Sequence, residues 1–224
     1  MDKQEKLIAR LFRDTLIIFL LSFFAATVGS VVDGMIIGNF LGTEAIAAFG
    51  FTLPYQAFVA VFHAVIMLGM QIMCSKALGR GNLNEANGIF SSAVAVGLAV
   101  MIFLTVTTIL FSEQIANILG TQENLGEIHT LTIDYLKGYS FTLPALALVE
   151  TLMPIMQLDS DRKRALIATA ILSTSNIAGD LINIFVLGGG LWGIGVATAI
   201  SYWITAGIFI FDFFKVSARF SFFS

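Results

Sequence analysis

The sequence predicts an all-α, polytopic membrane protein with six transmembrane helices. Hydrophobic residues make up 57% of the 224 residues and charged residues only 12%, whereas a typical soluble domain is about 45–50% apolar and about 25% charged. The mean hydropathy is +0.89. A helix that crosses a bilayer needs roughly 20 predominantly apolar residues. The chain has six such stretches, separated by polar or glycine-rich breaks: 15–40, 46–75, 86–111, 134–156, 165–187 and 191–211.

The length of these stretches favours helices over barrel strands. They lack the two-residue alternation of barrel strands, and each backbone polar group in lipid must be satisfied within its own segment. The first stretch follows four basic residues and resembles a signal peptide in that respect. Its apolar length exceeds the signal core of about 7–15 residues, and five further stretches follow. We therefore expect a retained first helix.

Basic residues predict the orientation of the helices. If the six stretches alternate in direction, every Lys and Arg except Lys137 falls on one side, which the positive-inside rule assigns to the cytoplasm. The loops on the other side carry Glu44, Glu113, Glu123 and Glu127. We expect a plasma-membrane protein with residues 1–14 as a cytoplasmic N-terminus, 15–214 as a six-helix lobe and 215–224 as a short, truncated cytoplasmic tail. The cytoplasmic basic residues are Lys3, Lys6, Arg10, Arg13, Lys76, Arg80, Arg162, Lys163, Arg164, Lys215 and Arg219.

The second and fourth stretches share a four-residue motif. Phe51-Thr52-Leu53-Pro54 recurs as Phe141-Thr142-Leu143-Pro144. A proline inside a membrane helix leaves a carbonyl unpaired, which neighbouring side chains or water must satisfy, so the helix can bend there. Alternatively, these prolines lie in the first turns of their helices, where no donor is needed.

Three carboxylates lie at membrane depth: Asp33, Glu150 and Asp180. An Asp at a helix centre costs roughly 2.5–3.5 kcal/mol on insertion scales, which favours a functional role. Asp33 shares a helix face with a stripe of small residues that would let another helix approach closely. The alternative for Asp33 is a structural hydrogen bond between helices. The stripe consists of Ser22, Ala26, Gly29 and Ser30.

Asp180 belongs to a predicted oxygen-rich cluster. Asn176, Asp180 and Asn183 follow each other at i, i+4 and i+7 on one helix face, and Thr198 on the next helix could reach that face. Carboxylate, amide and hydroxyl oxygens bind hard cations such as Na⁺, and a desolvated Asp can equally bind a proton. The residue types leave both ions open, and Asn and Thr also serve as interhelical contacts.

Other residues give weaker signals. His63 is interpreted as a hydrogen-bonded packing residue of the second helix. Glu150 lies near Met153, Pro154 and Met156, and with Gln157 it is a candidate second proton site or a partner for a cationic substrate. The single Cys74 excludes an intramolecular disulfide and a multi-cysteine metal site. No basic run indicates nucleic-acid binding, and no metal or organic cofactor is expected.

An ordered set of motifs resembles the multidrug and toxic compound extrusion (MATE) family. The first pieces are Val32-Asp33-Gly34, Ile37-Gly38, Leu41-Gly42 and Ala45-Ile46-Ala47-Ala48, which resemble the first helix and loop of that family. The later pieces resemble the loops after helices two and four and then helices five and six. They are Leu78-Gly79-Arg80-Gly81-Asn82 with Ala86, Gln157-Leu158-Asp159 through Arg164-Ala165, Asn176 to Asp180, and Gly193-Ile194-Gly195-Val196-Ala197-Thr198-Ala199-Ile200-Ser201.

This resemblance implies a secondary antiporter that expels organic, often cationic compounds in exchange for Na⁺ or H⁺. It places the cation site of the N-terminal lobe at Asp33, Asn176, Asp180 and Thr198. Some family members have a tyrosine one turn before the first-helix Asp, where this chain has Gly29. The change removes a hydroxyl from that side of the site and puts a preference for Na⁺ in doubt.

Length leaves several alternatives open. The family has twelve helices in two lobes with the substrate between them, and this chain supplies one lobe, so a second six-helix lobe is an expected partner beside small organic substrates and lipid. A lipid-linked oligosaccharide flippase of a related family and an inactive truncated fragment are the alternatives. A membrane-embedded enzyme is not expected, because only His63 and His129 could join clustered ligands or act as a base. The absence of a GxxxxGK[ST] phosphate loop fits gradient energy.

Overall fold

The structure is a computed structural model, and the prediction of an all-α fold is confirmed for the residues that it describes. These are residues 13, 16, 17, 20, 27–158 and 162–219, with the backbone alone for 154–158, 162–166 and 212–219. A first helix covers residues 27–40. The elements that follow are α2 (Thr43–Gly79), α3 (Leu83–Leu110), α4 (Ser112–Ile118), η1 (Glu123–Leu125), α5 (Glu127–Ser140), α6 (Thr142–Leu158), α7 (Arg162–Ile182), η2 (Asn183–Leu187) and α8 (Gly190–Arg219).

Four helical segments of the described chain are long and apolar enough to cross a membrane. They are Thr43–Gly79, Leu83–Leu110, Ile167–Leu187 and Gly190–Phe211, and they match the second, third, fifth and sixth predicted stretches. Most of the first predicted stretch before residue 27 lies outside the described residues, as do residues 1–12 and 220–224. The fourth stretch differs from its prediction, because it begins at Glu127 and is divided into α5 and α6.

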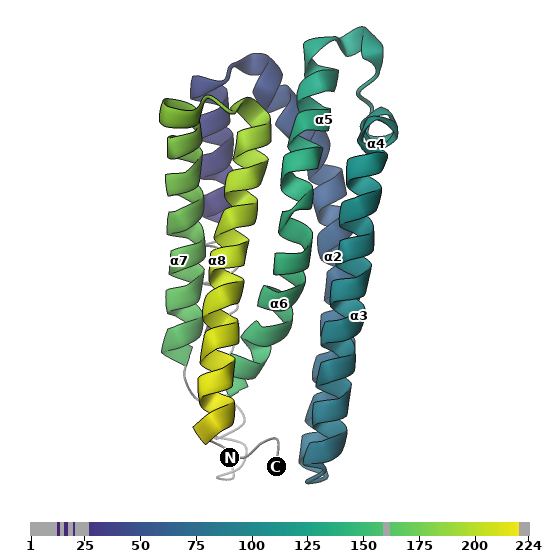
Figure 1. The fold of residues 1–224 in the computed structure, drawn as a ribbon, viewed down its shortest axis with the longest axis vertical. Helices are drawn as coiled ribbons and strands as arrows, with labels where there is room; N and C mark the ends of the chain where they lie inside the picture. Colours follow the sequence, from purple (N-terminus) through teal and green to yellow (C-terminus); the bar gives the residue numbers. More distant parts are fainter. Residues whose placement is uncertain (1–12, 14–15, 18–19, 21–26, 159–161, 220–224) are drawn as a thin grey trace.

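The helices run lengthwise beside one another, so their connections gather at two ends (Figure 1). The α2–α3 turn and the far end of α8 lie at one end. The turn at residues 41–42, α4 and the α7–α8 turn lie at the other. The basic residues Lys76 and Arg80 are therefore at the end where α8 finishes, as the predicted alternation requires. Two short helices that the sequence did not predict, α4 and η1, form part of the opposite end.

The division between α5 and α6 follows from Pro144. Proline has no N–H, so the carbonyl of Ser140, four residues earlier, loses its helical donor. The Thr105 hydroxyl of α3 donates to this carbonyl at 3.0 Å, and Trp203 Nε1 of α8 donates to the carbonyl of Phe141 at 3.1 Å. The predicted replacement of the missing bond by neighbouring side chains is confirmed here.

The two prolines of the repeated motif occupy different helical positions. Pro144 lies in the first turn of α6. Pro54 lies well inside α2, so the interpretation that it belongs to a first helical turn was wrong. Pro54 is the twelfth residue of α2, about three turns after Thr43, whereas Pro144 is the third residue of α6.

Glycines bring α8 close to α5. A Cβ at Gly195 would lie 2.6 Å from the backbone nitrogen of Tyr139, closer than real Cβ atoms approach other atoms. Around this contact, apolar side chains of the first helix, α2, α3, α5, α6 and α8 form the larger core, which includes Ile37, Val59, Met101, Leu136 and Ile194. The tight contact fixes how α5 presents its tyrosines to the interior.

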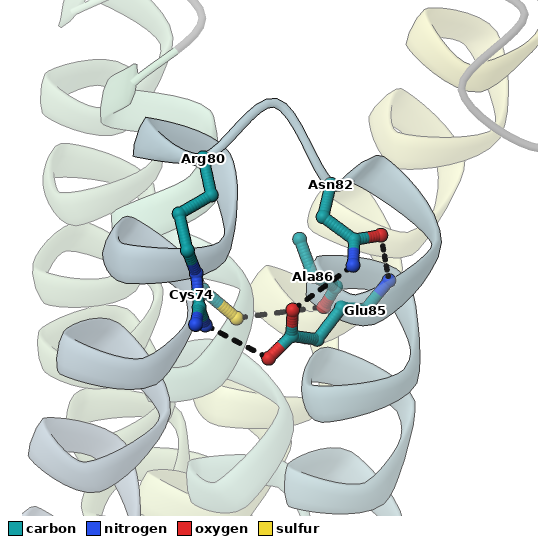
Figure 2. Close-up of polar contacts among 5 residues, drawn as sticks. All are labelled: Cys74, Arg80, Asn82, Glu85 and Ala86. Carbon is teal, nitrogen blue, oxygen red and sulfur yellow. Dashed lines mark hydrogen bonds and ion pairs between the residues drawn. The ribbon is translucent and has the colours of Figure 1, made fainter.

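The short α2–α3 turn is held by its own side chains (Figure 2). Asn82 Oδ1 accepts the backbone N–H of Glu85 at 3.1 Å and caps α3. Arg80 and Glu85 form an ion pair at 2.9 Å, and Gly81 has a positive φ of 73°, which suits glycine. The residues of the Leu78–Asn82 motif therefore form a compact helix-to-helix connection.

Candidate functional site

Asp33 and Asp180 come together between two helices distant in sequence. Asp33 lies on the first helix and Asp180 on α7, and their carboxyl groups interact with each other directly. Asp180 is 0% exposed. Among the residues that the structure describes, Asp33 Oδ1 and both oxygens of Asp180 are buried and accept no hydrogen bond. Two neighbouring carboxylates in this setting repel each other, and a proton or a cation would relieve the repulsion.

The small residues beside Asp33 do not act as the sequence predicted. We expected a close helix contact along this stripe, but a Cβ at Gly29 would meet none of the described atoms within 4 Å, and Ser30 is exposed. Ser22 and Ala26 lie outside the described residues. The expected close contact is therefore not seen at Gly29 and Ser30 within the described residues, and the first helix is buried two turns further along, where Ile37 is 0% exposed.

The predicted contact between α7 and α8 is confirmed. Asn176 Nδ2 donates to Thr198 Oγ1 at 3.2 Å, and Thr198 in turn donates to the carbonyl of Ile194 at 3.2 Å. A Cβ at Gly179 would lie 3.0 Å from the Cβ of Ala197. Small residues at this crossing bring the two helices together one residue before Asp180.

Asn183 has a different position from the one its spacing indicated. Its Nδ2 donates to the carbonyl of Gly190 at 2.9 Å, across the α7–α8 turn. Asn183 opens η2, a π-helical turn whose bond runs from Gly188 N to Asn183 O at 2.8 Å. A π-helical turn has more residues than the 3.6 of an α-helical turn. Asn183 therefore does not have the position that a regular α-helix would give it relative to Asn176. Asn183 therefore supports the turn after α7, and its Oδ1 is buried without a described hydrogen-bond donor.

Tyr135 of α5 supplies the hydroxyl that Gly29 cannot. It is 3% exposed and lies in the electrostatic field of both Asp33 and Asp180. Gln56 Nε2 of α2 donates to its hydroxyl at 3.4 Å. Sequence reasoning missed Tyr135 because no spacing rule joins α5 to the first helix. The only available signal was a polar aromatic residue within a predicted apolar span.

A second acidic group lies between α2 and α6. His63 Nδ1 and Glu150 Oε2 are 2.8 Å apart, and the side chains are 0% and 35% exposed. The interpretation of His63 as a hydrogen-bonded residue is confirmed, but its partner was not predicted. Met153 is partly buried on the same helix, whereas the side chains of Pro154, Met156 and Gln157 lie outside the described ones.

The donor set suits a proton or a monovalent cation rather than a bound transition metal. Within the described part of the chain, no three His, Cys, Asp or Glu side chains are grouped as metal ligands would be. Carboxylate, amide, hydroxyl and phenol oxygens at Asp33, Asp180, Asn176, Thr198 and Tyr135 are hard ligands.

Comparisons with known proteins agree on one family. The MatE family model matches residues 19–182. The multidrug export protein MepA of Staphylococcus aureus (strain NCTC 8325 / PS 47) is 29% identical over 203 residues, covering 89% of this chain and 44% of MepA. The probable multidrug resistance protein YoeA of Bacillus subtilis (strain 168) is 26% identical over 192 residues, covering 83% and 40%. These proteins are transporters and give no support to the flippase alternative.

A solved structure has the same fold. A MATE protein crystallised in its bent conformation superposes with a TM-score of 0.76 at 23% identity, covering 87% of this chain and 42% of that one. The chain thus spans less than half the length of the relatives it matches.

Proposed function

The chain belongs to the MatE family, and from this premise we propose that it is one six-helix lobe of a secondary antiporter in the plasma membrane. The lobe works with a second lobe, exports organic cations and takes H⁺ or Na⁺ in exchange. The relative MepA is named a multidrug export protein and YoeA a probable multidrug resistance protein, which supports this proposal.

The observation that carries this proposal is the pair Asp33 and Asp180. Their three buried oxygens accept no hydrogen bond from the described residues, although burying an unpaired charge is costly. A group of this cost is retained most easily when an incoming ion neutralises it for part of a transport cycle. Asn176, one turn before Asp180, is hydrogen-bonded to Thr198, and Tyr135 lies in the field of both aspartates, which supports the proposal that these three side chains supply further oxygens to the site.

The proposed mechanism couples this neutralisation to a change in helix packing. With both carboxylates charged, repulsion between Asp33 and Asp180 keeps the first helix apart from α7. Ion binding removes the repulsion and lets the first helix repack. The lobe then favours the conformation that has low affinity for the drug on the outward side. The open space beside Gly29 leaves room for this movement.

The experiment that tests the coupling removes one charge at a time. Asp33→Asn and Asp180→Asn keep the shape of each side chain but bind neither a proton nor a cation. We expect folded protein with ion-driven efflux reduced to the background level when the chain is joined to a C-terminal lobe. The matched control is Asp134→Asn, a half-buried Asp on α5, which should keep the parental rate. Parental efflux in Asp180→Asn would overturn the proposed site, and Glu150 would be the next candidate.

A second experiment tests the proposed orientation. Single cysteines at Lys76, Arg162 and Lys215, in a Cys74→Ser background, should resist an impermeant maleimide applied to intact cells. A cysteine at Glu123 should react. Labelling at Lys76 from outside would contradict the orientation, with both termini in the cytoplasm, that we propose from the basic residues.

A further inference from the structure

His63 is enclosed inside the lobe and reaches solvent only through its partner. The His63 side chain is 0% exposed, whereas Glu150 is 35% exposed. The second ring nitrogen, Nε2, is buried and has no hydrogen-bond partner among the described residues. A Cβ at Gly97 of α3 would lie 3.9 Å from this nitrogen. Within the described residues, the 2.8 Å contact with Glu150 is thus the side-chain hydrogen bond that links the ring to a partly exposed group.

We propose that His63 and Glu150 form a second proton-binding site, separate from Asp33 and Asp180. Without the extra proton, neutral His63 donates to the Glu150 carboxylate, and the pair has one negative charge. When the pair holds the extra proton, its net charge is zero. The proton is then either on His63, giving an imidazolium beside a carboxylate, or on Glu150, giving a carboxylic acid beside a neutral imidazole. One proton is gained and no covalent bond between heavy atoms changes.

Two tyrosines from other helices lie near the pair. Within the described residues, Glu150 faces Tyr139 of α5 and Tyr202 of α8, in addition to His63 of α2. The one acidic residue of α3, Glu85, lies in the α2–α3 turn, and that of α7 is Asp180. Tyrosines are uncharged near neutral pH, so these two neighbours add no charge to the pair.

The two acidic sites are neighbours but not one cluster. Tyr135 senses Asp33 and Asp180, and it stacks on Tyr139 with ring centroids 5.7 Å apart. Tyr139 in turn senses Glu150. Tyr202 lies in the electrostatic field of both Glu150 and Asp33, so the two sites share aromatic neighbours but consist of different pairs of side chains.

The test uses the full chain in lipid nanodiscs and does not depend on transport. The chain contains two histidines, His63 and His129, so ¹⁵N-histidine NMR of a His129→Asn variant reports His63 alone. We expect its ring signals to change between samples prepared at different pH values, because the pair gains a proton. Infrared difference spectra between the same samples should show a carboxylic acid band that disappears in Glu150→Gln.

Two controls separate this proposal from the coupling site. Glu113→Gln, an exposed residue of α4, should leave both signals unchanged, and Asp180→Asn should leave the His63 signals responsive to pH. The proposal is overturned if the His63 signals stay constant and no band is assigned to Glu150. It is also overturned if Asp180→Asn abolishes the response, since the two sites would then be one. Failure of the efflux experiment above would not change either readout.

Discussion

Asp180 and Glu150 are carboxylic acids inside the same helical lobe, but their surroundings differ. Asp180 is 0% exposed, faces a second carboxylate and accepts no hydrogen bond from the described residues. Glu150 is 35% exposed and has a buried imidazole 2.8 Å away. The first acid lacks a positive partner within the described chain, whereas the second has one side chain able to carry positive charge.

We therefore expect the two regions to have different roles. In the proposed function, the Asp33–Asp180 pair changes the packing of the lobe, whereas the His63–Glu150 pair only binds a proton. The repulsion between Asp33 and Asp180 raises the free energy of the folded state until an ion binds, so ion binding can drive a change in packing. The contact between His63 and Glu150 persists in each protonation state, so its proton can exchange with little change in packing. We expect substitutions in the two regions to act on stability in opposite directions.

The largest effect on stability is expected from a substitution at the α5–α8 contact, which lies close to both acidic pairs. Gly195→Ala places a Cβ 2.6 Å from the backbone of α5, the helix that carries Tyr135 and Tyr139. Backbone cannot yield as a flexible side chain does, and we expect the free energy of unfolding to fall by about 3 kcal/mol. Thermal unfolding in detergent measures this change.

The control for this substitution lies on the same helix. Gly207 of α8 has open space around its Cβ position, and Gly207→Ala should leave the unfolding temperature nearly unchanged. An equal effect of the two substitutions would show that the α5–α8 contact does not hold the two regions in place.

A second comparison tests whether substitutions in the two regions change the free energy of unfolding in opposite directions. At alkaline pH and low Na⁺, where both carboxyl groups of the pair are ionised, Asp180→Asn should raise the free energy of unfolding by about 1–3 kcal/mol, because it removes a buried, unpaired charge. Glu150→Gln should lower it by about 1 kcal/mol, because it weakens a charge-assisted hydrogen bond. The gain from Asp180→Asn should vanish in acid, where the parental carboxylate is itself protonated. Shifts of equal sign would remove the distinction between the regions.

A smaller effect is expected at Thr198. Thr198→Val removes the acceptor of Asn176 and should cost about 1 kcal/mol, with any Na⁺-dependent stabilisation reduced as well. Thr205→Val on the same helix removes only a bond to the Ser201 carbonyl of its own helix. Differential scanning fluorimetry with and without Na⁺ distinguishes these variants, and an identical Na⁺ response in both would exclude Thr198 from the ion site.

The smallest effect is expected at Gly29. Because no described atom lies within 4 Å of its Cβ position, Gly29→Ala should change the free energy of unfolding by no more than about 0.5 kcal/mol. The same substitution at Gly195 should be several times more costly. A large loss at Gly29 would indicate that this face of the first helix is packed after all.

Local patterns predicted most of the helices and half of the candidate site. Apolar length located α2, α3, α7 and α8, and four-residue spacing placed Asn176 and Asp180 on the face that meets Thr198. The π-helical turn at Asn183 changed the register that this spacing assumes.

Contacts between distant helices were not predictable in this way. Neither Tyr135 beside the aspartates nor His63 beside Glu150 follows from spacing, because each joins helices whose packing depends on the whole lobe. The sequence indicated a bend at Pro144, close to the break at Phe141. It could not indicate the donors Thr105 and Trp203, because these residues come from other helices.

The junction at Phe141 is a point at which α5 and α6 can bend relative to each other. It lies between Tyr135, which faces the aspartates, and Glu150, which contacts His63. Pro144 cannot donate to the carbonyl of Ser140, so Thr105 and Trp203 hold the two carbonyls of the junction from two other helices. A change in the angle between α5 and α6 would therefore break these two contacts rather than a hydrogen bond within either helix, and it would change the separation of the two acidic regions.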